Sequence, residues 1–196
     1  ITCRDWSSDV CSSDLGIIGD MTGSKVLYFR APSWSIGPKN LWALEVLEEE
    51  GIKVDSSLQP FRTFLSGNNK LPLKPFHPVI NDKRLDLLEV PSTILNIAGL
   101  RMPFSGGAYL RMLPESLIVR AFRNVTDERP AMMYLHPWEI DVDQPRLKSS
   151  FLFQISHYMN LDTTERKLRR ILSEFEFGPL SEVLKDSNFP DIRIKD

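Results

Sequence analysis

Three side chains suited to acid–base chemistry or charge stabilisation stand where predicted strands end. Arg30 ends the run KVLYFR, Asp55 follows IKV in IKVDSS, and His136 follows the apolar part of AMMYLHPWEI. In parallel α/β proteins the carboxyl ends of the strands line the active site. A histidine at such a position can act as general acid or base near neutral pH. We predict these three residues as catalytic. The alternatives are a strand-capping histidine and two ordinary ion-pair partners.

Aromatic side chains lie in the predicted loops beside these strand ends. Trp34, Tyr109 and Trp138 are candidates for stacking on the faces of sugar rings, and core packing is the equal alternative. The two other histidines are expected to be structural or on the surface. His77 lies between Phe and Pro in a loop, and His157 is expected to brace the loop before the last helix.

Metal-ligand spacing is missing from the chain. The only cysteines, Cys3 and Cys11, are not spaced as a common zinc pair. Neither a CxxC motif nor a pair of histidines at ligand spacing follows them. The motifs GxGxxG, GxxxxGK[ST] and GxSxG are also missing. We predict that this chain holds no metal.

Alternating strands and helices must position the candidate residues. KVLYFR (25–30) predicts a buried strand, LWALEVLEEEG (41–51) an amphipathic helix that stops at its glycine, and IKVDSS (52–57) a second strand. A strand–helix–strand unit implies a parallel sheet or barrel.

The rest of the chain continues this alternation. Asp162 and Glu165 are spaced as a capping box for the last helix. The predicted elements are a proline-rich loop (58–85), a strand (85–93), a turn or close approach at Gly106-Gly107, a helix (114–125), a strand ending near His136 (131–140) and an amphipathic helix (161–177).

Composition restricts the class of protein. The 196 residues are 42% hydrophobic and 26% charged, which is ordinary for a globular domain. A net charge of −2 gives no electrostatic footprint for nucleic acid, so no such partner is expected. Neither a membrane-spanning run nor a signal peptide is predicted.

The opening residues differ from the rest. DWSSDVCSSDL (5–15) resembles, codon by codon, the translation of a common short-read sequencing adapter. We interpret residues 1–15 as foreign sequence that forms a disordered, extended tail. The native N-terminus is then expected to be missing.

Six motifs, in order, resemble a known family. The motifs are FRAPSWSI (29–36), GIKVDSS (51–57), LLEVPST (87–93), GGAYLRMLP (106–114), YLHPWEID (134–141) and HYMNLDTTERKLRRIL (157–172). On these motifs the chain resembles, over about residues 17–180, bacterial polysaccharide deacetylases of the NodB-homology group, in particular the subfamily from exopolysaccharide loci associated with exosortase and PEP-CTERM sorting.

The resemblance implies a partial, distorted β/α barrel. Residues 16–145 would form the C-terminal part of the deacetylase domain, and residues 146–196 a family-specific extension with one amphipathic helix. In such enzymes a metal-bound water, usually on zinc, attacks an acetyl carbonyl with an aspartate as base. Arg30 would orient that aspartate, His136 would protonate the leaving group, and Asp55 would tune the histidine.

The family's Asp pair and His-xxx-His pair would precede residue 16. The resemblance thus implies that a longer parent protein uses a divalent metal to remove N- or O-acetyl groups from an exopolysaccharide, and that this chain alone is inactive. An open sheet edge is also expected. The alternatives are a related carbon–nitrogen hydrolase (a peptidoglycan deacetylase or an allantoinase-like enzyme) and a non-catalytic carbohydrate-binding module. The compartment stays open between the bacterial cytoplasm and the cell envelope.

Overall fold

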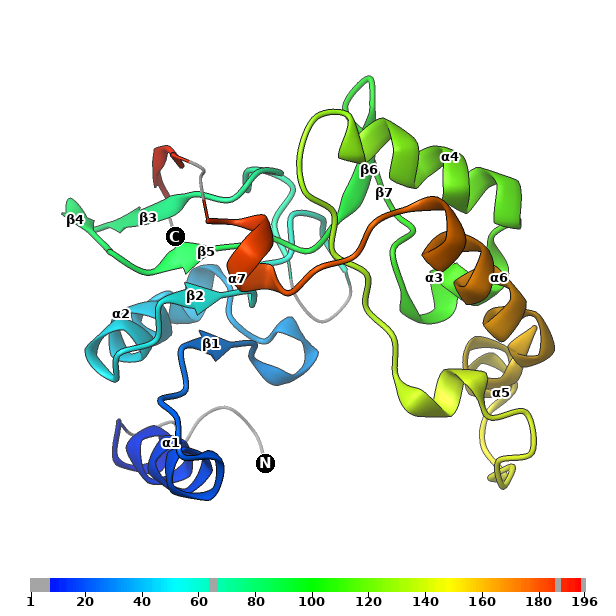
Figure 1. Cartoon of the computed structure of the whole chain (residues 1–196), viewed down its shortest axis with the longest axis horizontal. Coiled ribbons are helices and arrows are strands. Elements are labelled where there is room, and N and C mark those ends of the chain that lie inside the picture. The colour runs from blue at the N-terminus through cyan, green and yellow to red at the C-terminus, as the bar shows by residue number, and fades with distance from the viewer. Residues whose placement is uncertain (1–7, 64–66, 186–187, 195–196) are drawn as a thin grey trace. The chain divides into compact units, whose positions relative to one another are not determined.

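The computed structural model describes residues 8–63, 67–185 and 188–194 and divides the chain into two compact units (Figure 1). The first unit comprises the chain through Ser92 together with the segment from Asn188 onward, and the second comprises Thr93–Ser187. The segment predicted as a C-terminal extension, 146–196, is therefore shared between the units. Each unit is described by itself.

A parallel sheet forms the centre of the first unit. Its order is β1 (Tyr28–Phe29), β2 (Val54–Asp55) and β5 (Leu88–Glu89), and both strand pairs are parallel. Helix α2 (Trp42–Glu49) connects β1 to β2, which confirms the predicted strand–helix–strand unit. The prediction that the first strand is buried is wrong, because Tyr28 is exposed and Phe29 is only partly buried. The architecture is mixed α/β with small sheets, and no closed barrel forms among the described residues.

The apolar face of α2 explains its place in the unit. Leu41, Leu44 and Leu47 recur at helical spacing, and all three are buried in the core. The helix follows the short 3-10 helix η2 (Pro38–Asn40), whose proline opens its first turn. Gly51 follows α2 with a φ of +88°, a left-handed conformation that glycine adopts easily.

A second sheet contradicts the prediction of a loop over 58–85. Strands β3 (His77–Ile80) and β4 (Lys83–Arg84) form an antiparallel hairpin, and β8 (Asp191–Arg193) pairs with β3 in parallel. Asn81 and Asp82 turn the hairpin with φ values of +48° and +65°. Two successive left-handed residues favour the tight turn that matches strand twist. The prolines of this region masked that signal in the sequence.

The prediction of an extended tail is wrong for residues 8–15. Helix α1 (Ser8–Thr22) includes them, and residues 1–7 lie outside the described part of the chain. Leu15 packs against the core of the first unit, which gives this helix an apolar contact.

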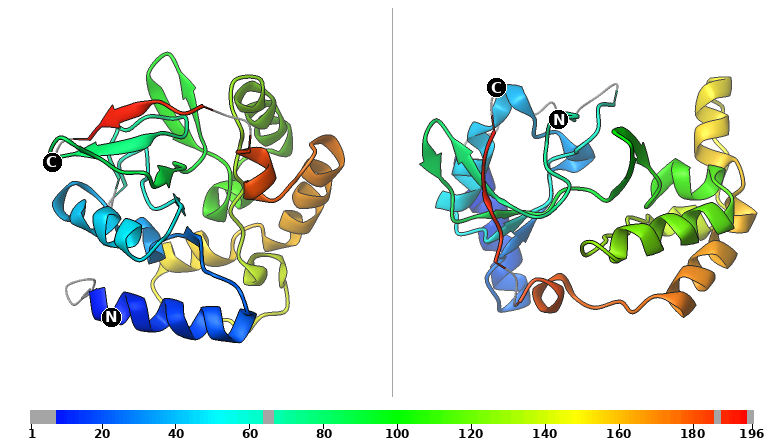
Figure 2. Two further views of the ribbon diagram at one scale, coloured as in Figure 1. Left: turned by 60° about the vertical axis from the view of Figure 1, so that its left-hand side comes forward. Right: turned by 90° about the horizontal axis from the view of Figure 1, so that it is seen from above.

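The second unit combines a hairpin with helices (Figure 2). Its core includes Phe104 and Phe122, whose ring centroids lie 4.9 Å apart, edge to face. The elements are β6 (Ile94–Ile97), β7 (Leu100–Pro103), α3 (Gly107–Met112), α4 (Glu115–Thr126), the 3-10 helix η3 (Pro137–Ile140), α5 (Phe151–Tyr158), α6 (Leu161–Glu174) and α7 (Leu180–Val183).

The strand predicted over 131–140 is wrong. Only Tyr134 forms an isolated bridge, with Gly106, and η3 follows. Pro137 lacks an N–H for a continued ladder and instead opens the 3-10 turn. The predicted close approach at the glycine pair is confirmed, because a Cβ on Gly106 would lie 1.9 Å from the Tyr134 carbonyl oxygen.

The predicted α6 is present, but its predicted capping box is wrong. Asn160 precedes the helix with a φ of +55°, and no side-chain cap bond forms there. The buried face of α6 includes Lys167 and Ile171, whereas Leu172 is 52% exposed. No helix in the described part of the chain is long and apolar enough to cross a membrane.

Candidate functional site

Arg30 and Ser56 join the three strands of the parallel sheet at its carboxyl edge. The Arg30 guanidinium donates from Nε to the Ser56 carbonyl oxygen (3.1 Å) and from Nη2 to Ser56 Oγ (2.9 Å). Ser56 Oγ donates in turn to the Val90 carbonyl oxygen (2.7 Å). The chain just beyond β1, β2 and β5 is thereby fixed at the edge where parallel α/β proteins bind their ligands.

Two buried carboxyl groups lie side by side at the same edge. Asp55 and Glu89 are in register on neighbouring strands, and both are fully buried. Asp55 accepts bonds from the Ser57 backbone N–H (3.0 Å) and from Ser57 Oγ (2.7 Å). Glu89 Oε1 accepts the backbone N–H of Leu58 (3.0 Å). Each carboxyl group is held by the chain that follows β2.

Burial raises the pKa of Asp55, with the hydrogen bonds from its neighbours opposing the shift. Burial and the adjacent Asp55 charge raise the pKa of Glu89 well above its ordinary value. Glu89 Oε2 is buried and has no hydrogen-bond partner among the described residues. Two carboxylates buried side by side repel each other, which favours a proton on one of them. The geometry defines a buried acid pair suited to holding one proton.

Trp34 belongs to this region of the first unit. It ends the short 3-10 helix η1 (Pro32–Trp34), and the Arg30 guanidinium carbon lies 5.4 Å from the centroid of its ring. That distance allows a cation–π interaction. Trp34 is half-buried, so its contact with the arginine accounts for part of the ring that was predicted to bind sugar.

His136 lies in the second unit, at the start of η3. Its side chain is exposed, and its Nε2 contacts the Tyr134 hydroxyl. The His136 backbone N–H donates to Glu139 Oε2 (2.8 Å). The backbone at this histidine is thus fixed by a carboxylate, while the ring faces solvent beside a hydroxyl.

A buried ion pair connects η3 to helix α3. Arg111 and Glu139 bond to each other, with side-chain exposures of 3% and 0%. Arg111 also donates to the Ser156 carbonyl oxygen. The sequence reasoning missed both residues, although each lies within a quoted motif (GGAYLRMLP and YLHPWEID). A charged residue at an otherwise apolar helical position was the available signal.

Trp138 is enclosed by other side chains. Its ring stacks on His157 with centroids 3.9 Å apart and planes 10° apart, and the Arg111 guanidinium carbon lies 4.9 Å from its ring. Burial, and then the positive charge of Arg111, lower the pKa of His157. His157 itself lies in α5, just before α6. The contacts with His157 and Arg111 thus cover part of the Trp138 ring that was predicted to stack on sugar.

The predicted site residues are distributed over both units. Arg30, Asp55 and Trp34 belong to the first unit, while His136, Tyr109 and Trp138 belong to the second. Tyr109, on α3, is 41% exposed and keeps an accessible face. His77, in β3, contacts the Leu87 carbonyl oxygen through Nδ1 (3.2 Å), a structural setting.

Within the described residues, no group of three or more His, Cys, Asp or Glu side chains is placed to hold a metal ion. The buried acid pair does not fit one either. Its oxygens accept bonds from Ser57 and Leu58, and burial raises the pKa of Glu89 well above its ordinary value, which disfavours the charged form that a metal needs. The chain's own described side chains therefore do not form the metal centre that the deacetylase resemblance implies.

Fold and site together define a mixed α/β protein with a buried acid pair in one unit and a buried ion pair in the other. The chain belongs to the family described as Domain of unknown function (DUF3473), whose model matches residues 56–185. This family is associated with polysaccharide deacetylase-like proteins. Neither a curated protein nor a solved structure matches the chain.

Proposed function

We propose that the chain is part of a metal-dependent polysaccharide deacetylase, related to the enzymes of exopolysaccharide loci, that removes acetyl groups from a bacterial exopolysaccharide. The observation that carries the proposal is the polar cluster at the carboxyl edge of β1, β2 and β5. There Arg30, Asp55 and Glu89 are held by hydrogen bonds in a largely apolar unit. Burying such groups costs stability, and sites of chemistry are where proteins keep them.

In this proposal His136 is the general acid. An acid that protonates a leaving amine must reach the substrate, and the exposed ring of His136 meets that requirement. The Tyr134 hydroxyl at Nε2 and the Glu139 carboxylate at the backbone N–H orient the ring and its segment.

Arg30 and Asp55 have positioning roles in the proposal. The Arg30 guanidinium is fixed by Ser56, so it presents a charge of constant geometry at the sheet edge. Asp55 receives its orientation from Ser57 and shares a proton with Glu89. The described residues offer no ligand set for the metal, so no step on a metal is assigned to this chain.

The proposal requires a longer protein that carries the metal ligands, and the test compares the 196-residue chain with a protein in which a longer N-terminal segment of a polysaccharide deacetylase precedes Gly16. Acetate release from an N-acetylated oligosaccharide is measured with added zinc. We expect release by the longer protein and none by the 196-residue chain. In the longer protein, His136→Asn should lower kcat by about 10²–10⁴-fold, the usual contribution of a general acid.

His77→Asn is the matched control, because it changes a histidine with a structural setting and should leave kcat within about twofold. Full activity of the His136→Asn protein contradicts the assigned role. Metal-independent glycan binding by both proteins without acetate release favours a non-catalytic carbohydrate-binding module instead.

A further inference from the structure

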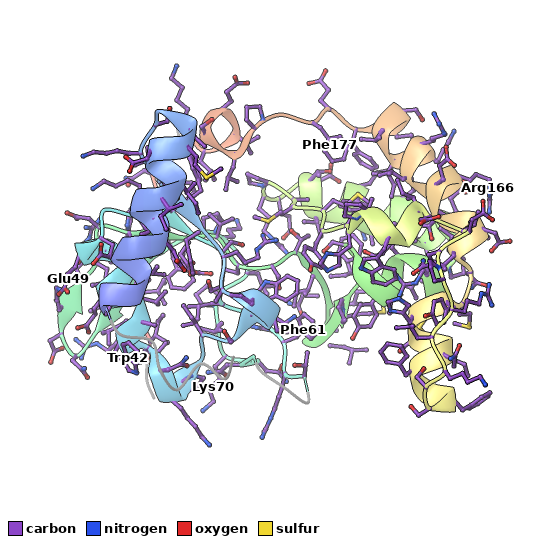
Figure 3. All side chains as sticks on the ribbon, turned by 90° about the horizontal axis from the view of Figure 1, so that it is seen from below. Trp42, Glu49, Phe61, Lys70, Arg166 and Phe177 are labelled. Atoms are coloured by element: carbon purple, nitrogen blue, oxygen red, sulfur yellow. The ribbon has the colours of Figure 1, made fainter. Side chains whose placement is uncertain are left out.

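A basic cleft in the first unit has none of Arg30, Asp55, Ser56 and Glu89 in its lining. It has a volume of about 930 Å³ and is lined by η2 with residues just before it, the chain on either side of residues 64–66, and β8 with the residue after it. Lys39, Arg62, Lys70 and Arg193 line it, and no described lining residue is acidic. Figure 3 marks Lys70 at the margin of this unit.

Three of these four cations form no ion pair with the residues that the structure describes. Arg193 pairs with Asp82 (2.6 Å). For Lys39, Arg62 and Lys70 the described residues provide no ion pair, and all three side chains are exposed. Positive charges gathered in a concave surface raise the local concentration of anions.

Two asparagines add oriented hydrogen-bond donors. Asn69 Oδ1 accepts the backbone N–H of Arg62 (2.8 Å), and Asn68 Oδ1 accepts the backbone N–H of Lys70 (2.9 Å). Because each amide oxygen accepts a backbone N–H, the side-chain NH₂ groups of both asparagines remain as donors for a ligand. The cleft therefore presents cations and N–H donors together, which suits carboxylate and hydroxyl oxygens.

Gly67 lies close to the backbone of Phe61. It has a φ of +97°, and a Cβ there would lie 1.9 Å from the Phe61 carbonyl oxygen. A side chain is therefore excluded where Gly67 approaches Phe61. The positions of Arg62 and Asn68 on the cleft wall depend on that approach.

We propose that this cleft binds the uronate carboxylates of an acidic polysaccharide. The choice of a glycan rests on the proposed function, and its acidic character is inferred from the three exposed cations of the cleft that have no ion pair among the described residues. A polymer that alternates uronate with N-acetylated sugar supplies both the carboxylates for the cleft and the acetyl groups for hydrolysis. The substrate class is thus an acidic, N-acetylated glycan rather than a neutral one.

The test measures binding of two hexasaccharides to the 196-residue chain by calorimetry, without metal. One is a hyaluronan hexasaccharide, which alternates glucuronate and N-acetylglucosamine, and the other is neutral chitohexaose. We expect the acidic probe to bind at least about tenfold more tightly, with affinity that falls as salt rises from 50 to about 200 mM. The triple variant Lys39→Gln/Arg62→Gln/Lys70→Gln should lose about tenfold in affinity, as expected for three exposed charge contacts.

The matched control removes three exposed cations elsewhere, as Lys25→Gln/Lys53→Gln/Arg120→Gln, and should bind like the parent chain. Equal binding of both hexasaccharides, or equal loss in both triple variants, overturns the proposal. So does tighter binding of inorganic phosphate or of a hexathymidylate than of the acidic glycan. The readout needs no catalysis, so acetate release can fail in the longer protein while the cleft still binds, and the reverse can also occur.

Discussion

The two units bury ionisable side chains in opposite ways. In the first, Asp55 and Glu89 place two acids together with both side chains fully buried. In the second, Arg111 and Glu139 place opposite charges together at similar burial. Two carboxylates that lie side by side and are shielded from water repel each other strongly. The acid pair therefore favours the state in which one carboxyl group is protonated. The opposite charges neutralise each other and need none.

The comparison shows that similar burial produces different responses to solution conditions. Protonation controls the stability of the acid pair, so the first unit should respond to pH. The ion pair depends on both partners being present, because removing one leaves the other charged and buried. Mutation should therefore affect the second unit most, and pH should affect the first.

The largest expected effect follows from breaking the ion pair. Arg111→Met leaves Glu139 buried without its cation and should lower the free energy of unfolding by about 3–5 kcal/mol. Urea denaturation followed by Trp138 fluorescence, in a background where the other tryptophans are phenylalanine, measures it. The control is Arg169→Met, which breaks an exposed pair with Glu165 (exposures 76% and 56%) and should cost below about 0.5 kcal/mol.

A second substitution sharpens this result. Adding Glu139→Leu to Arg111→Met removes the orphaned charge and should recover a large part of the loss, because apolar residues can replace a buried ion pair. If the single and double variants are equally destabilised, loss of packing rather than the unpaired charge explains the effect. The contrast between the two units would then fail.

Lys167 provides the next effect in size. Its Nζ donates to the carbonyl oxygens of Leu110 (3.0 Å), Arg111 (2.8 Å) and Leu113 (2.8 Å), which satisfies the end of α3 from helix α6. Lys167→Met keeps the stem but leaves these acceptors without their donor. We expect a loss of about 2–3 kcal/mol in unfolding free energy.

Lys148→Met is the control for Lys167→Met, because Lys148 is exposed and the substitution is the same. It should change stability by less than about 0.5 kcal/mol. Equal losses in the two variants, measured by urea denaturation, would mean that the bonds to the α3 carbonyl groups contribute nothing.

Periodicity in the sequence was enough to predict the parallel sheet but not the buried polar side chains at its edge. Leu41, Leu44 and Leu47 repeat at helical spacing between two apolar runs, and those local patterns predict the strand–helix–strand unit. Placement of Arg30 and Asp55 at strand ends followed directly. The hairpin at Asn81-Asp82 was missed because nearby prolines were given more weight than the turn residues.

Buried charges were the harder part of the site to predict. Glu89, Arg111 and Glu139 lie within motifs that were quoted, yet a charged residue in an apolar run is usually exposed. Their burial depends on partners that are distant in the sequence, Asp55 for Glu89 and Arg111 for Glu139. Only tertiary structure brings those pairs together, so spacing could not identify them.

The third prediction concerns the acid pair and pH. A carboxyl group whose folded pKa is raised binds more protons in the folded state, so its stabilising effect is complete below the unfolded value near 4.5 and decreases as pH rises above it. The slope reaches at most about 1.4 kcal/mol per pH unit for one proton. Arg30 is the cation that opposes the shift of Glu89.

Glu89→Gln tests this titration directly. The amide N–H can donate to Asp55, so we expect the fall in stability as pH rises above about 4.5 to flatten. Glu49→Gln, on the exposed face of α2, should leave the slope unchanged. Urea denaturation across this range, with Trp138 replaced by Phe to follow the first unit, measures both. An unchanged slope in Glu89→Gln means that the acid pair does not hold the proton.

The smallest expected effect is a change in the titration of His157. Burial against Trp138 and the charge of Arg111 lower its pKa below 6.5, so the folded state holds this ring neutral, and that stabilisation decreases as pH falls below 6.5. Trp138→Leu removes the stacked ring and should return the NMR titration of the His157 ring protons toward 6.5. Trp34→Leu, the same change in the first unit, should not. If both variants shift the pKa of His157 equally, the stacked ring of Trp138 is not what lowers it. The electrostatics of the second unit then do not depend on this stacking contact.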